Sequence, residues 1–227
     1  MMKIYQLNKS VIRLTNNAVS FLNGLTSNTM DKPWNAFVNI HGMIIATFDQ
    51  LVFNEEEVWI IVEKFCVGEV VQHLERYAKL SGVKIEIKDN FFVYFDCAGD
   101  WPLEKGDLFI PQKQGRLIIT KKQLSPNVSD EEFTLFRLKN NIPMQGVDYK
   151  DDFLLNINEE DFISFTKGCF LGQEPISKVH SRSRPSWRLV VKAEEDCTDE
   201  ERAKMTSKAV DSQTNQRLGF VFVSNKD

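Results

Sequence analysis

The spacing of apolar residues predicts two amphipathic helices in the first third of the chain. After Asn16 and Asn17, which are good helix-capping residues, apolar side chains recur with helical spacing and predict a helix over about residues 17–29. A second apolar stripe predicts a helix that ends at Ser81 and Gly82. Its members are Val67, Val70, Val71, Leu74, Tyr77 and Ala78. Around these helices the pattern changes to that of strands.

Runs rich in Val, Ile and Phe predict strands on both sides of the second helix. They cover 37–53 with a break at Gly42, then 58–62, 83–88, 91–97 and 116–120. Strands, a helix and two more strands argue for an α+β layer, because a doubly wound parallel sheet would alternate strand with helix. The predicted fold class is therefore α+β, with mixed or antiparallel sheets and packed helices.

The second half of the chain carries one clear helix start and a pair of strands. Ser129 and Glu132 have the spacing of a capping box and predict a helix over about 130–141, stopped by Ile142-Pro143. Strands predicted over 187–193 and 217–223 bracket a highly charged connection, 194–208. The chain is therefore expected to end in a short β module.

Composition limits the classes of function. The 227 residues carry a formal net charge of -4 with a pI near 5.5, which argues against direct nucleic-acid binding. The four cysteines form no C-x-x-C pair and the three histidines do not recur at ligand spacings, so no stably bound metal is expected. No run approaches the ~20 apolar residues that span a bilayer. We expect a protein of the reducing cytoplasm with no membrane partner.

A single thiol stands in the most site-like stretch of the chain. Cys169 lies between Gly168 and Gly172 and close to Lys167. The ammonium of Lys167 and a helix N-terminus just downstream would both favour the thiolate. A lone cysteine is also commonly a small buried apolar side chain. Local chemistry leaves two interpretations open: Cys169 is a functional thiol, or it is a buried cysteine at a structural turn of the backbone.

The stretch around this thiol reads Lys167-Gly168-Cys169-Phe170-Leu171-Gly172-Gln173-Glu174 and matches the pattern K-G-C-[FY]-x-G-Q-E. This pattern resembles the signature of the YgfZ family, folate-binding proteins similar in fold to the T-protein of the glycine cleavage system. The family's early F-L-Q-G-x-x-T-N helix is resembled by 21–28, and His41-Gly42-Met43-Ile44-Ile45 lies where the family usually has Q-G-R-I. The segment from Arg137 to Asp148 is similar to R-x-x-x-G-I-P-x-x-G-x-D. The match runs from about residue 5 to residue 190.

The resemblance implies a T-protein-like arrangement of subdomains. Residues 1–42 and 121–185 would form one discontinuous T-protein-like subdomain. Residues 43–120 would form an inserted ββαββ-like subdomain, and 186–227 a reduced β-barrel-like module. Family members place a folate-binding channel between these parts.

The resemblance also implies a function. Members of the family support the assembly or repair of iron–sulfur clusters in a subset of enzymes, including radical enzymes that modify tRNA, and they use or sense a tetrahydrofolate species. An accessory protein rather than an enzyme is implied, with iron–sulfur client or assembly proteins as partners. Cys169 would be the functional thiol, Lys167 would set its electrostatics, and Gln173 and Glu174 would flank it. One thiolate cannot hold a cluster alone, so transient contact or exchange fits better.

The sequence departs from the aminomethyltransferases to which the resemblance extends. Those enzymes carry an aspartate in the strand after a glycine pair, and the counterparts here by spacing from Gly42 are Ala46 and Thr47. Asp49 is off that spacing and is expected to be a solvated strand residue. The glutamate that binds the pterin in the T-protein is replaced by Lys139. Tetrahydrofolate-dependent aminomethyl transfer is therefore the alternative function, and a folate-free binding scaffold a third.

One stretch of this acidic chain is strongly basic. It holds Lys178, His180, Arg182, Arg184 and Arg188, with Trp187 among them. Such a patch suits a polyglutamate tail, RNA phosphates or an acidic partner surface, and ordinary solvation explains it equally well. Trp187 could stack on a pterin or a base, although we expect a core position for it at the head of an amphipathic strand. The residues expected to bind the cofactor are Arg137, Lys139, Arg182 and Trp187.

Overall fold

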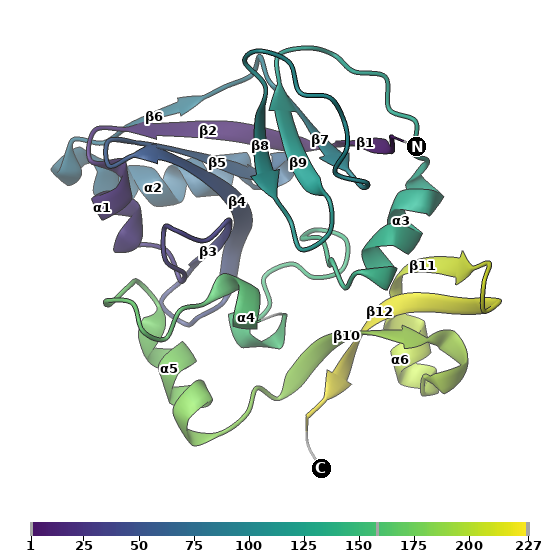
Figure 1. Cartoon of the computed structure of the whole chain (residues 1–227). Helices are drawn as coiled ribbons and strands as arrows, with labels where there is room; N and C mark the ends of the chain where they lie inside the picture. Colours follow the sequence, from purple (N-terminus) through teal and green to yellow (C-terminus); the bar gives the residue numbers. More distant parts are fainter. Residues whose placement is uncertain (1, 158, 226–227) are drawn as a thin grey trace.

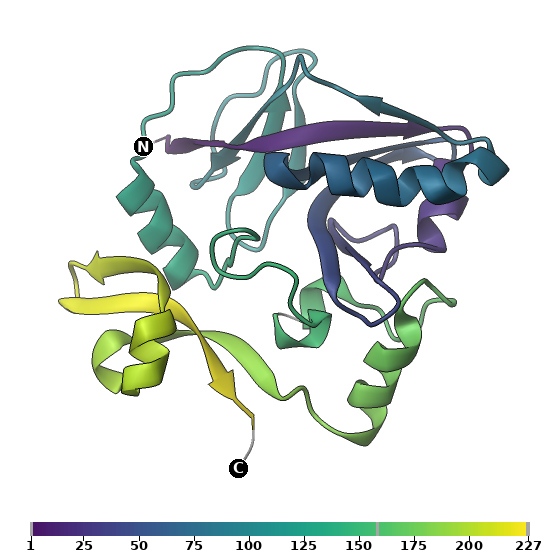
Figure 2. The ribbon, with the colours of Figure 1, turned by 180° about the vertical axis from the view of Figure 1, so that it is seen from behind.

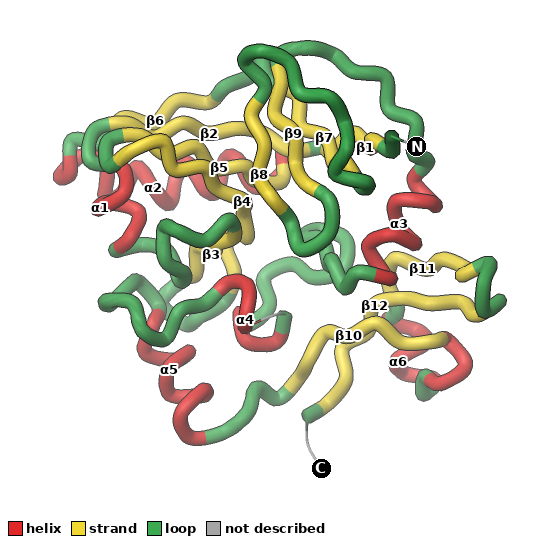
Figure 3. The backbone as a smooth tube through the Cα atoms, in the orientation of Figure 1, coloured by secondary structure: helices red, strands yellow, loops and turns green. Residues whose placement is uncertain are grey.

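The strands of the protein form three sheets (Figures 1 and 3), seen in a computed structural model that describes residues 2–157 and 159–225. The largest sheet has the order β3-β4-β5-β2-β6, and all its neighbours are antiparallel. In that order the strands are Trp34–Val38, Ile44–Asn54, Glu57–Glu63, Lys9–Thr15 and Lys84–Ile87. The predicted α+β class with antiparallel pairing is confirmed.

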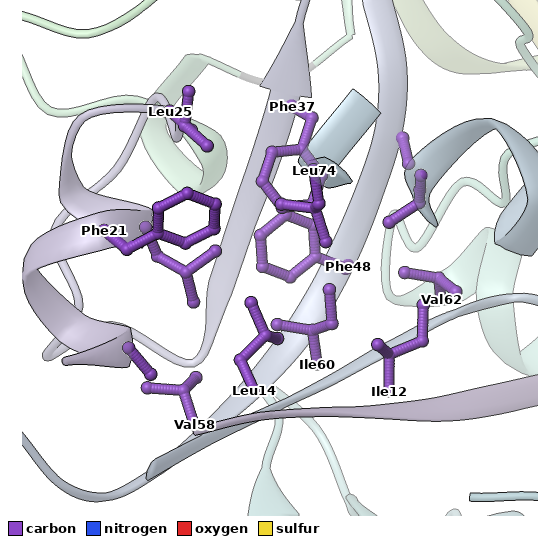
Figure 4. Packing of buried hydrophobic residues seen from close by; sticks show 14 of the residues in the cluster. Ile12, Leu14, Phe21, Leu25, Phe37, Phe48, Val58, Ile60, Val62 and Leu74 are labelled. Atoms are coloured by element: carbon purple, nitrogen blue, oxygen red, sulfur yellow. The ribbon is translucent and has the colours of Figure 1, made fainter. Parts of the chain in front are cut away.

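The central part of the five-stranded sheet is buried on both faces, whereas the edge strand β6 is largely exposed. Successive side chains of a strand point to opposite faces, so Ile12 of β2 packs toward helices α1 (Ala18–Asn23) and α2 (Val67–Ser81), while Val11 packs toward the second sheet. The helix side is shown in Figure 4, where Phe21 and Leu74 lie against side chains of the sheet. Burial on both faces explains why β5 contains the continuous apolar run from Val58 to Val62.

The second sheet has the order β1-β7-β9-β8 and packs against helix α3 (Asp130–Lys139). Its strands are Ile4–Leu7, Phe92–Asp96, Arg116–Thr120 and Leu108–Pro111. The ring of Phe133 on α3 stacks on Tyr5, with centroids 4.0 Å apart. The predicted capping box is confirmed, since Glu132 N donates to Ser129 Oγ and Ser129 N donates to the Glu132 carboxylate.

The third sheet, β10-β12-β11, forms the C-terminal module together with helix α6 (Asp199–Lys204). Its strands are Trp187–Ala193, Gln216–Ser224 and Thr206–Asp211. The expected charged connection over 194–208 is wrong in part, because it contains a short 3₁₀ turn, α6 and the start of β11. Thr198 and Glu201 cap α6 reciprocally. Hydrophobic periodicity missed this helix because nearly all of its side chains are charged or polar.

Short helices join the second sheet to the third. They are η2 (Leu154–Asn156), α4 (Glu159–Phe162) and α5 (Gln173–Arg182), and a further 3₁₀ turn, η1 (Lys64–Cys66), precedes α2.

Strand pairing crosses the subdomain boundary predicted after residue 42, since β3 pairs with β4 and β1 pairs with β7. In the described part of the chain, no helix combines the length and apolarity needed to cross a membrane.

Helix α1 is shorter than the predicted 17–29, whereas α2 ends as predicted. Gly24 caps α1, and Thr26 already bridges to Phe37 of β3. Asn17 precedes α1, but its side chain makes no cap; instead its backbone N–H donates to the Glu56 carboxylate at 2.7 Å. Gly82 ends α2 with φ 72, a left-handed conformation that glycine adopts without steric cost.

One histidine is buried, in its neutral form, between helix α2 and the five-stranded sheet. His73 on α2 is 4% exposed, lies beside Phe37 and Tyr77, and its Nε2 has no hydrogen-bond partner in the described residues. Burial, helped by nearby Arg76, lowers the pKa of His73 from 6.5 to about 4. Between pH 6.5 and 4 the His73 side chain is therefore protonated in the unfolded chain but neutral in the folded one. The free energy of unfolding falls as the pH drops through this range.

We expect His73→Leu to remove this acid sensitivity. Between pH 7.5 and 5 the parent protein should lose on the order of 1–3 kcal/mol of unfolding free energy that the variant keeps, measured by urea unfolding at each pH. His41→Gln, which changes an exposed histidine, is the matched control and should retain the parent's pH profile. An equal acid loss in His73→Leu and the parent would contradict the assignment.

Candidate functional site

Two of the sequence motifs, far apart in the chain, lie side by side. Ser164 N donates to Ser27 O at 3.0 Å, and Leu171 N donates to Gly24 O at 3.1 Å. Between these two points the Lys167 amine donates to Thr26 O at 2.6 Å. The segment that carries the candidate thiol is therefore fastened along the turn that follows α1.

Lys167 is held by backbone carbonyls. Its Nζ also donates to Asn28 O at 2.9 Å and lies 5.3 Å from the ring centroid of Phe170. Burial lowers the pKa of Lys167 to about 8. Phe170 is buried, whereas Cys169 and Gly168 are exposed. The expected influence of Lys167 on the Cys169 thiol stays a prediction.

Gly172 fixes where helix α5 begins. It precedes the helix with φ 82, and a Cβ built there would lie 2.2 Å from Asn39 O and 2.9 Å from a methyl of Val38. Only glycine fits this contact with the β3–β4 turn. Gln173 and Glu174 form the first turn of α5, where Pro175 is tolerated. The helix start expected just downstream of Cys169 is confirmed.

A buried charge cluster lies elsewhere, where β2, β5 and β4 run together. Lys9 Nζ donates to Asp49 Oδ2 at 2.9 Å and lies 3.5 Å from Glu63 Oε1. The three side chains are 15%, 8% and 8% exposed. Burial disfavours the charged form of Lys9, but the two carboxylates outweigh it and raise its pKa; burial also raises the pKa of Glu63, which Lys9 only partly offsets.

Uncharged polar side chains extend this charge cluster. Gln112 Nε2 donates to Asp49 Oδ1 at 2.9 Å, and Trp34 Nε1 donates to Gln112 Oε1 at 2.8 Å. Nearby, the hydroxyls of Thr47 and Tyr149 lie 2.6 Å apart, and burial raises the pKa of Tyr149. Asp49 was expected to be solvated, and that prediction is wrong, because β4 is covered on both faces at this point.

These groups line a cavity of about 100 Å³ between the first two sheets, α3 and α4, which we call the central pocket. Its apolar wall is formed by Leu7, Phe48, Phe95, Leu117, Phe133, Ile142, Pro143, Met144 and Phe162. Lys113, which pairs with Asp161 at 2.6 Å, also lines it. Aromatic walls with a few convergent polar groups are typical of small-molecule sites.

Arg137 lines the central pocket but is committed to a structural network. Its guanidinium donates to Asp148 Oδ2 and to Ser207 Oγ, both at 2.6 Å. Asp148 also accepts from Met144 N at 2.9 Å and from the hydroxyls of Thr206 and Ser207. This network joins α3, the pocket wall and β11.

The other expected cofactor-binding residues lie away from the central pocket. Lys139 pairs with Asp211 at 2.8 Å across the contact between α3 and β11. Arg182 is exposed at the end of α5. The core position expected for Trp187 is wrong, because its side chain at the start of β10 is 46% exposed. Sequence reasoning missed Lys9, Glu63 and Gln112, whose proximity arises from strand pairing.

Comparison with solved structures gives a match over nearly the whole chain. The glycine cleavage system aminomethyltransferase T from Bartonella henselae superposes with a TM-score of 0.74 and 12% sequence identity, covering 98% of this chain and 78% of that one. The chain has the T-protein fold. No family model and no curated protein matches the sequence. At 12% identity this similarity shows the fold alone, and the function has to be argued from the residues of the site.

Gly172 and Gly168 allow a matched test of whether the contact between α5 and the β3–β4 turn requires glycine. Gly172→Ala places a Cβ against Asn39 O in a left-handed backbone, so we expect a loss of about 1–3 kcal/mol in unfolding free energy. Gly168→Ala is the control, because a Cβ there meets no atom within 4 Å. Equal stability of both variants in urea unfolding would argue against the contact between α5 and the β3–β4 turn.

A second pair of variants tests the network around Arg137. Asp148→Asn leaves the buried guanidinium without its counter-ion and should cost about 3–5 kcal/mol of unfolding free energy. Lys139→Met breaks a more exposed ion pair at the same contact and should cost about 1 kcal/mol or less. Similar losses for the two variants in guanidinium unfolding would refute a dominant role for the Arg137–Asp148 pair.

Proposed function

We propose that the central pocket binds a folate-type ligand and that the protein acts with it as an accessory protein in iron–sulfur cluster assembly or repair. The observation that carries the proposal is the charge cluster of Lys9, Asp49 and Glu63, which borders an aromatic-lined cavity. Two carboxylates share one ammonium there. Buried charges are costly unless they are paired, and one ammonium does not neutralise two carboxylates, so a ligand that donates hydrogen bonds would complete this cluster.

The hydrogen-bond acceptors that line the central pocket suit the polar edge of a reduced pterin. The ring of a folate carries an amino group and ring N–H groups, which need acceptors such as Asp49 and Glu63. Its flat faces suit the apolar wall, where Phe48 and Phe162 contribute aromatic rings. Trp34, Gln112 and Lys9 hold Asp49 in place. The residues present would therefore orient such a ring, and Lys113 would supply a cation for a glutamate carboxylate.

Cys169 supports the iron–sulfur part of the proposal. The thiol is exposed, and its segment leads back along the chain to Asp161 and Phe162 of the pocket wall. Ser27 Oγ donates to Phe162 O at 2.6 Å, so the turn that holds Lys167 also holds the pocket wall. An exposed single thiolate suits transient contact with a cluster carried by a partner. The cluster would be cargo rather than a resident cofactor.

A second candidate function, tetrahydrofolate-dependent aminomethyl transfer, is favoured by the position of Asp49. This carboxylate is buried at the central pocket in the strand that follows Gly42, so the absence of a suitable aspartate no longer counts against such an enzyme. Against it, Asp49 is already engaged by Lys9 and Gln112. Release of ammonia and methylenetetrahydrofolate from an aminomethyl donor would favour the enzyme over the accessory protein.

Calorimetric titration with tetrahydrofolate tests the pocket. We expect saturable binding by the parent protein and a loss of at least about tenfold in affinity for Asp49→Asn and for Glu63→Gln. Glu57→Gln is the matched control, because Glu57 lies at the other end of β5, paired with Arg13, and should change affinity by less than about twofold.

Cys169→Ala separates the two halves of the proposal. This variant should bind tetrahydrofolate as the parent does, yet fail to restore the activity of a radical iron–sulfur enzyme in cells that lack the parent protein. Absence of saturable binding by the parent would leave a folate-free scaffold. Full restoration by Cys169→Ala would remove the thiol from the proposed function.

A further inference from the structure

The most basic part of the surface is continuous in sequence and faces outward. From Pro175 to Ala193 the chain contains no Asp or Glu. Lys178 and Arg182 are exposed one turn apart on α5, and Arg184 and Arg188 are exposed on the connection to β10 and on that strand. Figures 1 and 2 show α5 and this connection at the outer edge of the molecule. We call residues 178–188 the basic connection.

Among the residues that the structure describes, the cations of the basic connection have no counter-ion. In the described part of the chain, no ion pair involves Lys178, Arg182, Arg184 or Arg188. Other cations of the protein are paired: Lys192 with Glu201 at 2.7 Å, and Lys139 with Asp211 at 2.8 Å. The protein carries more carboxylates than cations overall, so the gathering of unpaired cations on one edge is not a consequence of composition. Like charges at this spacing repel each other.

Exposed aromatic rings lie within and beside these cations. Trp187 is 46% exposed between Pro185 and the strand, and Phe165 is 37% exposed. Phe165 stacks on His180 of α5, with ring centroids 3.6 Å apart and planes inclined by 16°. Arginine and aromatic residues are enriched at protein–protein interfaces, and tryptophan and arginine are among the residues that contribute most to binding energy. Trp187 thus places an exposed aromatic side chain in a row of exposed arginines.

From these observations we propose that the basic connection is a docking surface for an acidic segment of a partner protein. Arginine forks would bind its carboxylates bidentately, and Trp187 would contact an apolar side chain between them. Nucleic acid fits less well, because the net charge of -4 repels a long polyanion and four unpaired cations make a short footprint. The surface is distinct from the central pocket, so the inference stands independently of the ligand proposed there.

Fluorescence anisotropy with the full-length protein tests the inference. The probe is a fluorescein-labelled acidic peptide with glutamates on either side of a central Phe-Leu pair, at low salt. R182E/R184E/R188E should weaken its binding by more than about tenfold, and W187A by severalfold. The matched control is K79E/K84E/K105E, which reverses exposed, unpaired lysines elsewhere with the same change in net charge and should weaken binding by less than about threefold.

Each alternative has its own outcome. Equal weakening by the two triple variants would overturn the inference, because it would show a response to net charge alone. So would tighter binding of a single-stranded oligonucleotide with the same number of negative charges, which would assign the surface to nucleic acid. Absence of saturable peptide binding by the parent would also overturn it. Melting curves that match the parent's confirm that the variants are folded. An unchanged tetrahydrofolate titration of R182E/R184E/R188E separates this surface from the pocket.

Discussion

The buried pair of Arg137 and Asp148 is the contact on which the rest of the structure depends. It is 4% and 0% exposed, and it joins α3, the wall of the central pocket and the C-terminal sheet at a single point. Breaking such a pair leaves a buried charge unsatisfied, so the loss of this one contact would destabilise the packing of all three parts. The C-terminal module, small as it is, thereby becomes part of the support for the pocket.

The central pocket depends on a different kind of constraint. Lys9, Asp49 and Glu63 come from three neighbouring strands, and Lys9 stands directly opposite Glu63 in the pairing of β2 with β5. A one-residue slip in this register would turn the charges to the other face of the sheet. The apolar residues that alternate with them hold the register. The core thus supplies the precision of the site, and the charges supply its chemistry.

How much could be predicted from the sequence depends on how local the cause is. Gly82 and the Ser129–Glu132 box act within one helical turn, and the structure contains both. Asp49 was expected to be solvated because its neighbours in sequence do not reveal that two layers cover β4. The charged residues of the pocket were not predicted for the same reason, because strand pairing brings them together across long stretches of sequence. Cys169 was singled out through its motif, and its role as a functional thiol stays a prediction.

The anchoring of Lys167 has a consequence for how such a sequence can diverge. Its amine is bound by the carbonyl oxygens of residues 26 and 28, groups that every amino acid carries. The two carbonyl acceptors would survive replacement of the side chains at residues 26 and 28, although the weaker contact with the Thr26 hydroxyl at 3.5 Å would be lost. The lysine has no substitute of equal reach that presents a compact ammonium. Among related sequences, this contact would leave a constant lysine with no co-varying partner. It would be invisible to any search for coupled substitutions, although it ties together segments that lie far apart in the chain.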